Sequence, residues 1–170
     1  MSKGGFVTRK GAKKGARVSR AALSADVKAQ LAARMGIEAV ADMNPDATTP
    51  NMPPVLVDSP DIYVLMDRPE IIADHTGDAA RGAGPDVVRS ITNKFGIRAC
   101  MDYCVRTITP KDREPEAYEI EAFRPDIHKS IAESGATVVV LAGPTAIRWG
   151  MGSSTPKGNP VESARGRFWP

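Results

Sequence analysis

Cysteine, aromatic residues and long apolar runs are all scarce in this 170-residue chain, and the shortages of cysteine and of apolar runs each exclude a class of protein. The two cysteines, Cys100 and Cys104, are too few for a disulfide-stabilised domain, and their spacing fits neither a redox CxxC motif nor a zinc module. Aromatic residues make up 5% of the chain, and no run approaches the roughly 18–20 apolar residues that span a bilayer. The N-terminus lacks the apolar segment of a secretory signal. We therefore expect an intracellular protein with no membrane partner.

Acidic residues are absent from the first 25 residues, which carry seven Lys and Arg. Because the whole chain has a net charge of +3, the other 145 residues carry −4. A basic, glycine-containing arm commonly contacts nucleic acid by neutralising phosphates, although it can also be a solvated tail that only aids solubility. We expect residues 1–22 to be a disordered basic arm. The cations expected to contact nucleic acid there are Lys10, Lys13, Lys14 and Arg17.

Composition divides the rest of the chain into three segments. Residues 23–40 have apolar side chains at four-residue spacing, which predicts a short amphipathic helix with Gly36 near its end. Residues 41–60 contain five prolines and no periodicity, which predicts a linker. The folded domain is expected to cover residues 61–170.

Strand-like and helix-like stretches alternate within that domain. The expected strands are residues 61–67, 99–108 and 136–143, and the expected helices are residues 86–96, residues 116–135 and a third helix that begins near Pro144. The continuous β-branched run in the last strand is typical of a strand buried on both faces. This order predicts an α/β fold, a three-layer α/β/α sandwich around a short parallel sheet, with functional residues on the loops that follow the strands.

Four short motifs follow one another in the second half of this domain: DREP, EIEAFRP, VVVLAGPTA and RGRF. Their order resembles the uracil-DNA glycosylase superfamily, especially family 4 and the glycosylase-like domain at the front of some phage DNA polymerases. In that family an Asn-Arg-x-Pro loop precedes a Glu-Ile-x-x-Cys-Arg-Pro helix, a strand ending Leu-Gly-x-x-Ala, and an Arg-Gly pair. The resemblance covers residues 61–170 and implies the glycosylase fold, DNA as a partner, and hydrolysis of an N-glycosidic bond as the ancestral activity.

The resemblance assigns the family's functional groups to particular residues. The catalytic carboxylate corresponds to Asp67, in VLMDRPE, where Met66 and Glu70 replace two glycines. The base-stacking Phe corresponds to Ala80 and the base-reading Asn to Tyr103, so Met66, Ala80 and Tyr103 would line the substrate pocket. A flipped uracil needs a carboxylate, a stacking partner and paired hydrogen bonds. With the last two replaced, we expect excision activity to be weak or lost.

The iron–sulfur cluster of family 4 requires four thiolates. Two of its cysteine positions correspond here to Thr107 and Phe123, and the N-terminal cysteine pair is missing. We therefore expect no cofactor and no metal. Cys100 and Cys104 are expected to be buried strand residues.

The C-terminal part of the resemblance is incomplete. The family places a His-containing loop and a DNA-wedging residue after Arg-Gly, whereas this sequence stops at RGRFWP. We expect either a C-terminally truncated version of the fold or the absence of those functions. The remaining arginines expected to contact phosphate, or only to lie on a hydrated surface, are Arg113, Arg165 and Arg167.

Three functions stay open at this point. The first is a DNA-associated protein of phage-type replication or repair, in the host cytoplasm if phage-encoded, with excision weak or lost. The second is an active uracil-DNA glycosylase with a divergent pocket, in which Asp67 activates water and Tyr103 stacks on the base. The third is a non-catalytic module that docks on a DNA polymerase or serves in the virion, and whose arm grips nucleic acid or a partner.

Overall fold

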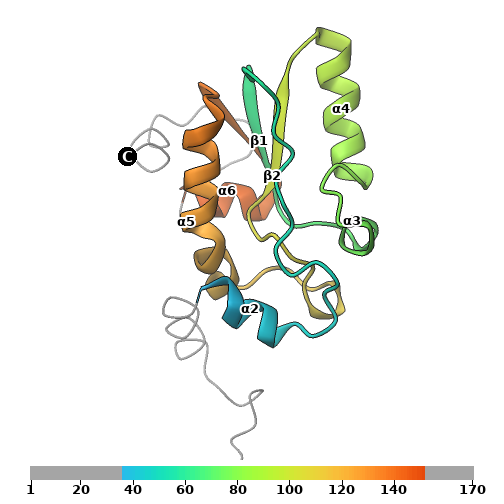
Figure 1. Ribbon diagram of the computed structural model, residues 1–170, viewed down its shortest axis with the longest axis vertical. Helices are drawn as coiled ribbons and strands as arrows, with labels where there is room; N and C mark the ends of the chain where they lie inside the picture. Colours follow the sequence, from blue (N-terminus) through green and yellow to red (C-terminus); the bar gives the residue numbers. More distant parts are fainter. Residues whose placement is uncertain (1–35, 152–170) are drawn as a thin grey trace, which may run out of the picture.

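The computed structural model describes residues 36–151, which form a three-stranded parallel sheet with helices on both faces (Figure 1). The strand order is β2-β1-β3. The elements are α2 (Ile37–Met43), β1 (Ile62–Met66), α3 (Ile71–Thr76), α4 (Ala83–Phe95), β2 (Ala99–Tyr103), the 3-10 turn η2 (Pro110–Asp112), α5 (Ala117–Ser134), β3 (Val138–Ala142) and α6 (Pro144–Met151). The predicted α/β class and its three layers are confirmed.

One face of the sheet packs against α5 and α6, which lie together on the same side of the strands in Figure 1. Because side chains alternate along a strand, Tyr63, Leu65 and Cys100 all point to this face. They join Phe123 of α5 and Trp149 of α6 in the larger apolar cluster of the protein. None of the helices described is both long and apolar enough to cross a membrane.

The opposite face carries a smaller apolar cluster beneath α3 and α4. Val64, Met66 and Tyr103 supply it from β1 and β2, and Val88 of α4 packs against it. Met66 lies beside Tyr103 in the β1–β2 register and beside Ala142 in the β1–β3 register. This face therefore holds, at the carboxyl ends of the strands, two of the residues that the sequence assigned to a substrate pocket.

Helix α5 is the element that the sequence predicted best. Its N-cap is Glu116, and a reciprocal capping box joins the Glu116 and Glu119 side chains to each other's backbone amides. The Glu116 N–H donates to Glu119 Oε2 at 2.7 Å. At the other end, Gly135 adopts the left-handed conformation, with φ 75°, that commonly ends a helix. Both signals are local, so they can be recognised in the sequence.

The segment before β1 differs from its prediction as a linker. Gly36, expected near the end of a helix, is instead the N-cap of α2 and has φ 61°. Val40 and Met52 are fully buried. Val55 forms an antiparallel bridge with Met101, and each residue donates its N–H to the other's carbonyl, at 2.8 and 2.9 Å. The prolines prevent regular structure here but not packing, so the folded body begins well before residue 61.

Two strands also differ from expectation. β2 ends at Tyr103, five residues earlier than expected, and the Cys104 N–H that follows it still donates to the Met66 carbonyl of β1 at 2.7 Å. β3 lies at one edge of the sheet that residues 36–151 form, and it is not buried on both faces. Val138 is 50% exposed and Val140 is 39% exposed.

Candidate functional site

The loop after β1 contains two carboxylates, and each caps the N-terminus of a helix. Asp67 Oδ1 accepts the backbone N–H of Ala146, in the first turn of α6, at 2.8 Å. Glu70 Oε1 accepts the backbone N–H of Gly84, in the first turn of α4, at 3.1 Å. The first amides of a helix have no partner within it and carry partial positive charge. The two acids therefore stabilise the two helix ends nearest to the carboxyl edge of β1.

Each of these carboxylates lies against a glycine. A side chain at Gly143, which has φ 122°, would collide with the Asp67 carboxylate. A side chain at Gly82, with φ 120°, would come within 2.7 Å of Glu70 Oε1. Gly143 is the glycine of the VVVLAGPTA motif, so the conformation and the close approach together explain why a glycine stands there.

The environment of Asp67 perturbs its ionisation. Burial raises the pKa of Asp67 above the ordinary carboxyl value of 3.8, while the amides of Ala146 and Thr145 and the guanidinium groups of Arg148 and Arg68 oppose that rise. A partly buried carboxylate with a raised pKa, in a loop after a strand, is a candidate general base. Here, however, Asp67 Oδ1 already accepts a hydrogen bond from the first turn of α6.

The three residues expected to line a base pocket lie together, but as packed core. Met66 is 6% exposed and Tyr103 is 2% exposed, both belong to the cluster beneath α4, and Ala80 packs against that cluster. The Tyr103 hydroxyl donates to the Ala79 carbonyl at 3.0 Å, which ties the end of β2 to the glycine-rich loop of residues 77–82, between α3 and α4. Burial also raises the pKa of Tyr103, so the hydroxyl stays a neutral donor. The ring is therefore a fixed packing element.

A buried polar network lies on the other face of β2, and sequence reasoning missed it. Asp102 is 0% exposed and accepts from Arg106 Nε at 2.9 Å and from Arg106 Nη2 at 2.7 Å. The Tyr63 hydroxyl donates to Asp102 Oδ2 at 2.7 Å, and Arg106 Nη2 also donates to Ser130 Oγ at 2.7 Å. The network joins β1, β2 and α5. Its sequence signal is an Asp within a buried strand, followed four residues later by an Arg.

The cysteines have the character of core residues. Cys100 lies in β2 and Cys104 just after it, and both are free thiols with 0% exposure. Burial raises the pKa of the Cys104 thiol, which disfavours the thiolate that metals and redox partners need. Thr107 and Phe123, the positions of two cluster cysteines in the resemblance, are likewise fully buried. Among residues 36–151, no three His, Cys, Asp or Glu side chains are grouped so as to hold a metal ion.

Arg113, expected to contact phosphate, forms a fork with Glu119 of α5. Its guanidinium donates to Glu119 Oε2 at 2.7 Å and to Glu119 Oε1 at 2.8 Å, and it reaches the Tyr118 hydroxyl at 3.3 Å. This pairing fixes the DREP loop on α5, so contact with DNA stays a prediction. The other expected phosphate contacts lie outside the described residues: Lys10, Lys13, Lys14, Arg17, Arg165 and Arg167.

An open groove of about 660 Å³ lies between the loops that follow β1 and β2. Arg68 and Asp112 join these loops through an ion pair of 2.6 Å. Lys111 and Asp112 both have positive φ, at 55° and 56°, a conformation that is strained for residues with side chains. The lining combines apolar side chains with charges of both signs: Asp46, Arg68, Glu70, Ile71, His75, Ile108, Thr109, Pro110, Lys111 and Asp112.

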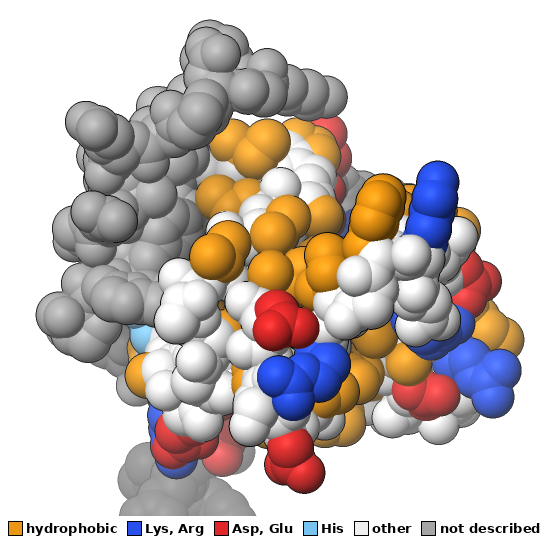
Figure 2. Space-filling view, turned by 90° about the horizontal axis from the view of Figure 1, so that it is seen from above, with side chains coloured by type: hydrophobic (Ala, Val, Ile, Leu, Met, Phe, Trp, Pro, Cys, Tyr) orange, Lys and Arg blue, Asp and Glu red, His pale blue; other side chains and the backbone are white. Residues whose placement is uncertain are grey.

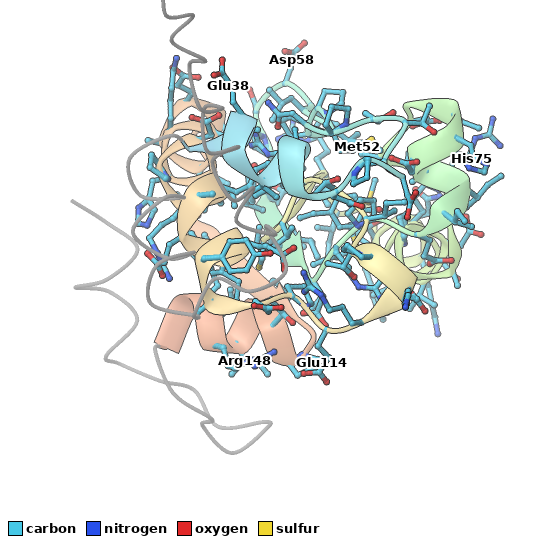
Figure 3. All side chains as sticks on the ribbon, turned by 90° about the horizontal axis from the view of Figure 1, so that it is seen from below. Glu38, Met52, Asp58, His75, Glu114 and Arg148 are labelled. Carbon is cyan, nitrogen blue, oxygen red and sulfur yellow. The ribbon has the colours of Figure 1, made fainter. Side chains whose placement is uncertain are left out.

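The net charge of residues 36–151 does not favour the binding of a polyanion such as DNA. Residues 36–151 contain 18 Asp and Glu but 11 Lys and Arg, so the basic character of the chain comes from the segments on either side. Figure 3 looks onto the carboxyl ends of the strands, where Arg148 lies beside Glu114, with which it forms an ion pair of 3.3 Å. Several cations of the body are thus already neutralised by neighbouring acids.

No protein-family model matches this sequence, and a search of curated proteins finds no relative. The likeness to uracil-DNA glycosylases therefore stays a prediction from the ordered sequence motifs. Met66, Ala80 and Tyr103 pack together in the apolar cluster on the α4 side of the sheet, whereas Asp67 follows Met66 in the chain and caps α6.

Proposed function

We propose that this protein has a uracil-DNA glycosylase-like fold and associates with DNA in phage-type replication or repair without efficient base excision. The observation that carries the proposal is that the residues at and just after the carboxyl end of β1 are already engaged in packing and helix capping. Asp67, at the catalytic position, caps α6, and Met66 and Tyr103, at the pocket positions, are packed core.

Excision requires an extruded base to be held while a carboxylate acts at the sugar. Stacking on an aromatic ring is worth about 1–3 kcal/mol per base, and Ala80 offers none of it. Tyr103, whose hydroxyl is bonded to the Ala79 carbonyl, has no amide with which to read a uracil edge. Stacking on the base and hydrogen bonding to its edge are thus both weakened in this proposal, while the α/β fold is retained.

DNA affinity in this proposal comes from the basic arm. The acidic body repels phosphates, whereas the arm carries Lys10, Lys13, Lys14 and Arg17 with no acid nearby. If each of these four cations neutralises one phosphate, affinity falls with about the 3.6 power of salt concentration. Raising salt from 50 to 200 mM then weakens binding roughly 150-fold.

The first experiment tests excision. Wild-type protein and Asp67→Asn are incubated with single-stranded and mispaired uracil oligonucleotides, and abasic sites are measured by alkaline cleavage. We expect both proteins to stay at background. Robust excision that disappears in Asp67→Asn would overturn the proposal and would favour an active glycosylase with a divergent pocket.

The second experiment tests the arm by fluorescence anisotropy with a labelled oligonucleotide at several salt concentrations. Replacing the four arm cations by Ala should weaken binding at least tenfold and flatten the salt dependence. The matched control removes four exposed cations from the body instead: Arg81, Lys94, Arg98 and Lys129. An equal loss in both variants, or no DNA binding by the wild type, would contradict arm-mediated association.

A further inference from the structure

The groove between the loops that follow β1 and β2 has the size and the position of a small-ligand site. Its volume of about 660 Å³ lies within the range of about 300–1,000 Å³ that is usual for pockets that hold small molecules. Ligands of parallel α/β sheets commonly bind beyond the carboxyl ends of the strands, where β1 and β2 lead into these loops. Every residue that lines the groove lies between positions 46 and 112, so the groove belongs to the folded body.

Half of the ionisable side chains that line the groove are already paired. The Asp112 carboxylate lies 2.6 Å from Arg68 Nη2, and Glu70 Oε1 accepts the backbone N–H of Gly84. The other half form no side-chain hydrogen bond or ion pair with any residue of the range 36–151: Asp46, His75 and Lys111. This part of the chain therefore leaves one carboxylate, one imidazole and one ammonium group for a ligand.

These charges suit one phosphate group better than a row of phosphates. Salt screens charges that lie more than about 8 Å apart, so a small ligand responds to the side chains beside it and not to the net charge of the body. The Lys111 ammonium group and an imidazole N–H of His75 can both donate to a single phosphate. A terminal phosphate carries a charge of about −1.5 to −2 at pH 7, more than an internal phosphodiester does. Asp46 and Asp112 would repel the further phosphates of a continuous strand.

The rest of the lining suits a flat organic group attached to that phosphate. Ile71 is 65% exposed, and Ile108 and Pro110 are partly buried, so the walls present aliphatic surface to the groove. Ligand pockets usually combine such apolar walls with a few polar groups that fix the orientation of the ligand. Asp46 is an acceptor only, so it is matched by a sugar hydroxyl or by the amino group of a base.

Lys111 lines the groove in a backbone conformation that is unfavourable for a lysine. Its φ is 55° and its ψ is 30°, and Asp112 follows with a φ of 56°. Arg68 holds this turn through Asp112, since it pairs with the carboxylate and also donates to the carbonyl at 3.2 Å. Glycine and asparagine adopt such angles more readily, so the turn itself does not explain a lysine here. Strained residues of this kind are common where a protein clamps a ligand.

We propose that the groove binds a nucleoside 5′-monophosphate group, with its phosphate on Lys111 and His75 and its base against Ile71 and Pro110. The group can belong to a free nucleotide or to the 5′ end of a DNA strand. The inference goes beyond the proposed function, because it requires neither DNA association through the arm nor a pocket at Tyr103. The two can therefore fail separately.

The test is isothermal titration calorimetry of the full chain with thymidine 5′-monophosphate, and with thymidine as the ligand that lacks the phosphate. The nucleotide should bind about tenfold more tightly than thymidine or better, and Lys111→Asn and His75→Ala should each remove most of that difference. Because asparagine tolerates a φ of 55°, Lys111→Asn should also keep or raise the urea midpoint.

Lys94→Gln is the matched control and should bind the nucleotide like the wild type. It removes an exposed cation near the end of α4, on the opposite end of the molecule from the groove. Figure 2 looks onto that end and shows a band of hydrophobic side chains with Lys and Arg scattered around it.

No binding at about 5 mM nucleotide would overturn the proposal, as would equal affinities for the nucleotide and thymidine. A folded Lys111→Asn protein that binds like the wild type would also overturn it. So would loss of nucleotide binding when Lys10, Lys13, Lys14 and Arg17 are replaced by Ala, since the phosphate would then lie on the arm.

A second measurement distinguishes the two sources of the group, by anisotropy with 3′-labelled oligonucleotides that carry a 5′-phosphate or a 5′-hydroxyl. Tighter binding of the phosphorylated strand that disappears in Lys111→Asn identifies a strand end as the ligand. Equal binding of both strands, with nucleotide binding intact in the calorimeter, identifies a free nucleotide. Tighter binding of the phosphorylated strand that persists in Lys111→Asn contradicts the assignment of the phosphate to the groove.

Discussion

Removing the charge that neutralises Asp102 tests how far the buried network stabilises the fold. Asp102 accepts four hydrogen bonds: two from Arg106, one from the Tyr63 hydroxyl and one from the Tyr103 N–H. Arg106→Met removes two donors and the only guanidinium in this network, but it fills a similar volume. Leaving one member of a buried pair without its partner costs about 3–5 kcal/mol. That is a large fraction of the roughly 5–15 kcal/mol by which domains are stable.

The measurement is urea unfolding followed by far-ultraviolet circular dichroism, from which the midpoint and slope give the free energy of unfolding. Asp102→Asn combined with Arg106→Met should recover part of the loss, because the amide is neutral and still accepts from Tyr63. Lys129→Met is the control, since its pair with Glu133 is exposed at both ends and is worth less than about 1 kcal/mol. A loss below about 1 kcal/mol for Arg106→Met, or strictly additive effects in the double variant, would refute this reasoning.

Three further outcomes follow from the structure, two at the candidate site and one at His128 of α5. Asp67→Ala should lose about 1 kcal/mol of stability with the α6 cap, whereas Asp67→Asn keeps an acceptor for the Ala146 N–H. Because burial raises the pKa of Asp67 in the folded state, the free energy of unfolding should fall as pH rises through and above 3.8. This pH dependence should vanish in Asp67→Asn. Tyr103→Phe should cost about 1–3 kcal/mol in urea melts, because the buried Ala79 carbonyl loses its donor. The pKa of His128 is lowered by burial and by Arg124, so stability should fall as pH drops below 6.5, and His128→Gln should be flat in the same range.

Local signals were predictable from the sequence and non-local ones were not. Helix α5 is specified by Glu119 and Gly135, which act within a few residues of the helix ends. The exposure of Val140 depends on the order of the strands, because the same β-branched run would be buried at the centre of the sheet. The burial of Met52 within a proline-rich stretch depends likewise on a distant partner, since its N–H donates to the carbonyl of Arg106.

The candidate site shows the same division. The sequence motifs are sufficient to predict that Asp67, Met66 and Tyr103 lie at one end of the sheet. The capping of α6 by Asp67 was not predicted, because it links residues 79 positions apart. The glycine that permits this approach, Gly143, was visible in the motif, but its role becomes clear only when the neighbouring carboxylate is in place.

The packing around Tyr103 also sets an energetic limit on base binding at this site. The Tyr103 ring packs between Met66 and the loop of residues 77–82, so a base can enter that position only if the ring moves out. The Ala79 carbonyl then loses its hydrogen-bond donor. Emptying a buried aromatic position costs about 3–5 kcal/mol. Since 1.4 kcal/mol corresponds to a tenfold change in affinity, this penalty weakens base binding by about 10²–10⁴-fold. The proposed association through the basic arm carries no such penalty, because neutralising phosphates does not require the Tyr103 ring to move. In the proposed function, association with DNA through the arm therefore has a lower energetic cost than the binding of an extruded base.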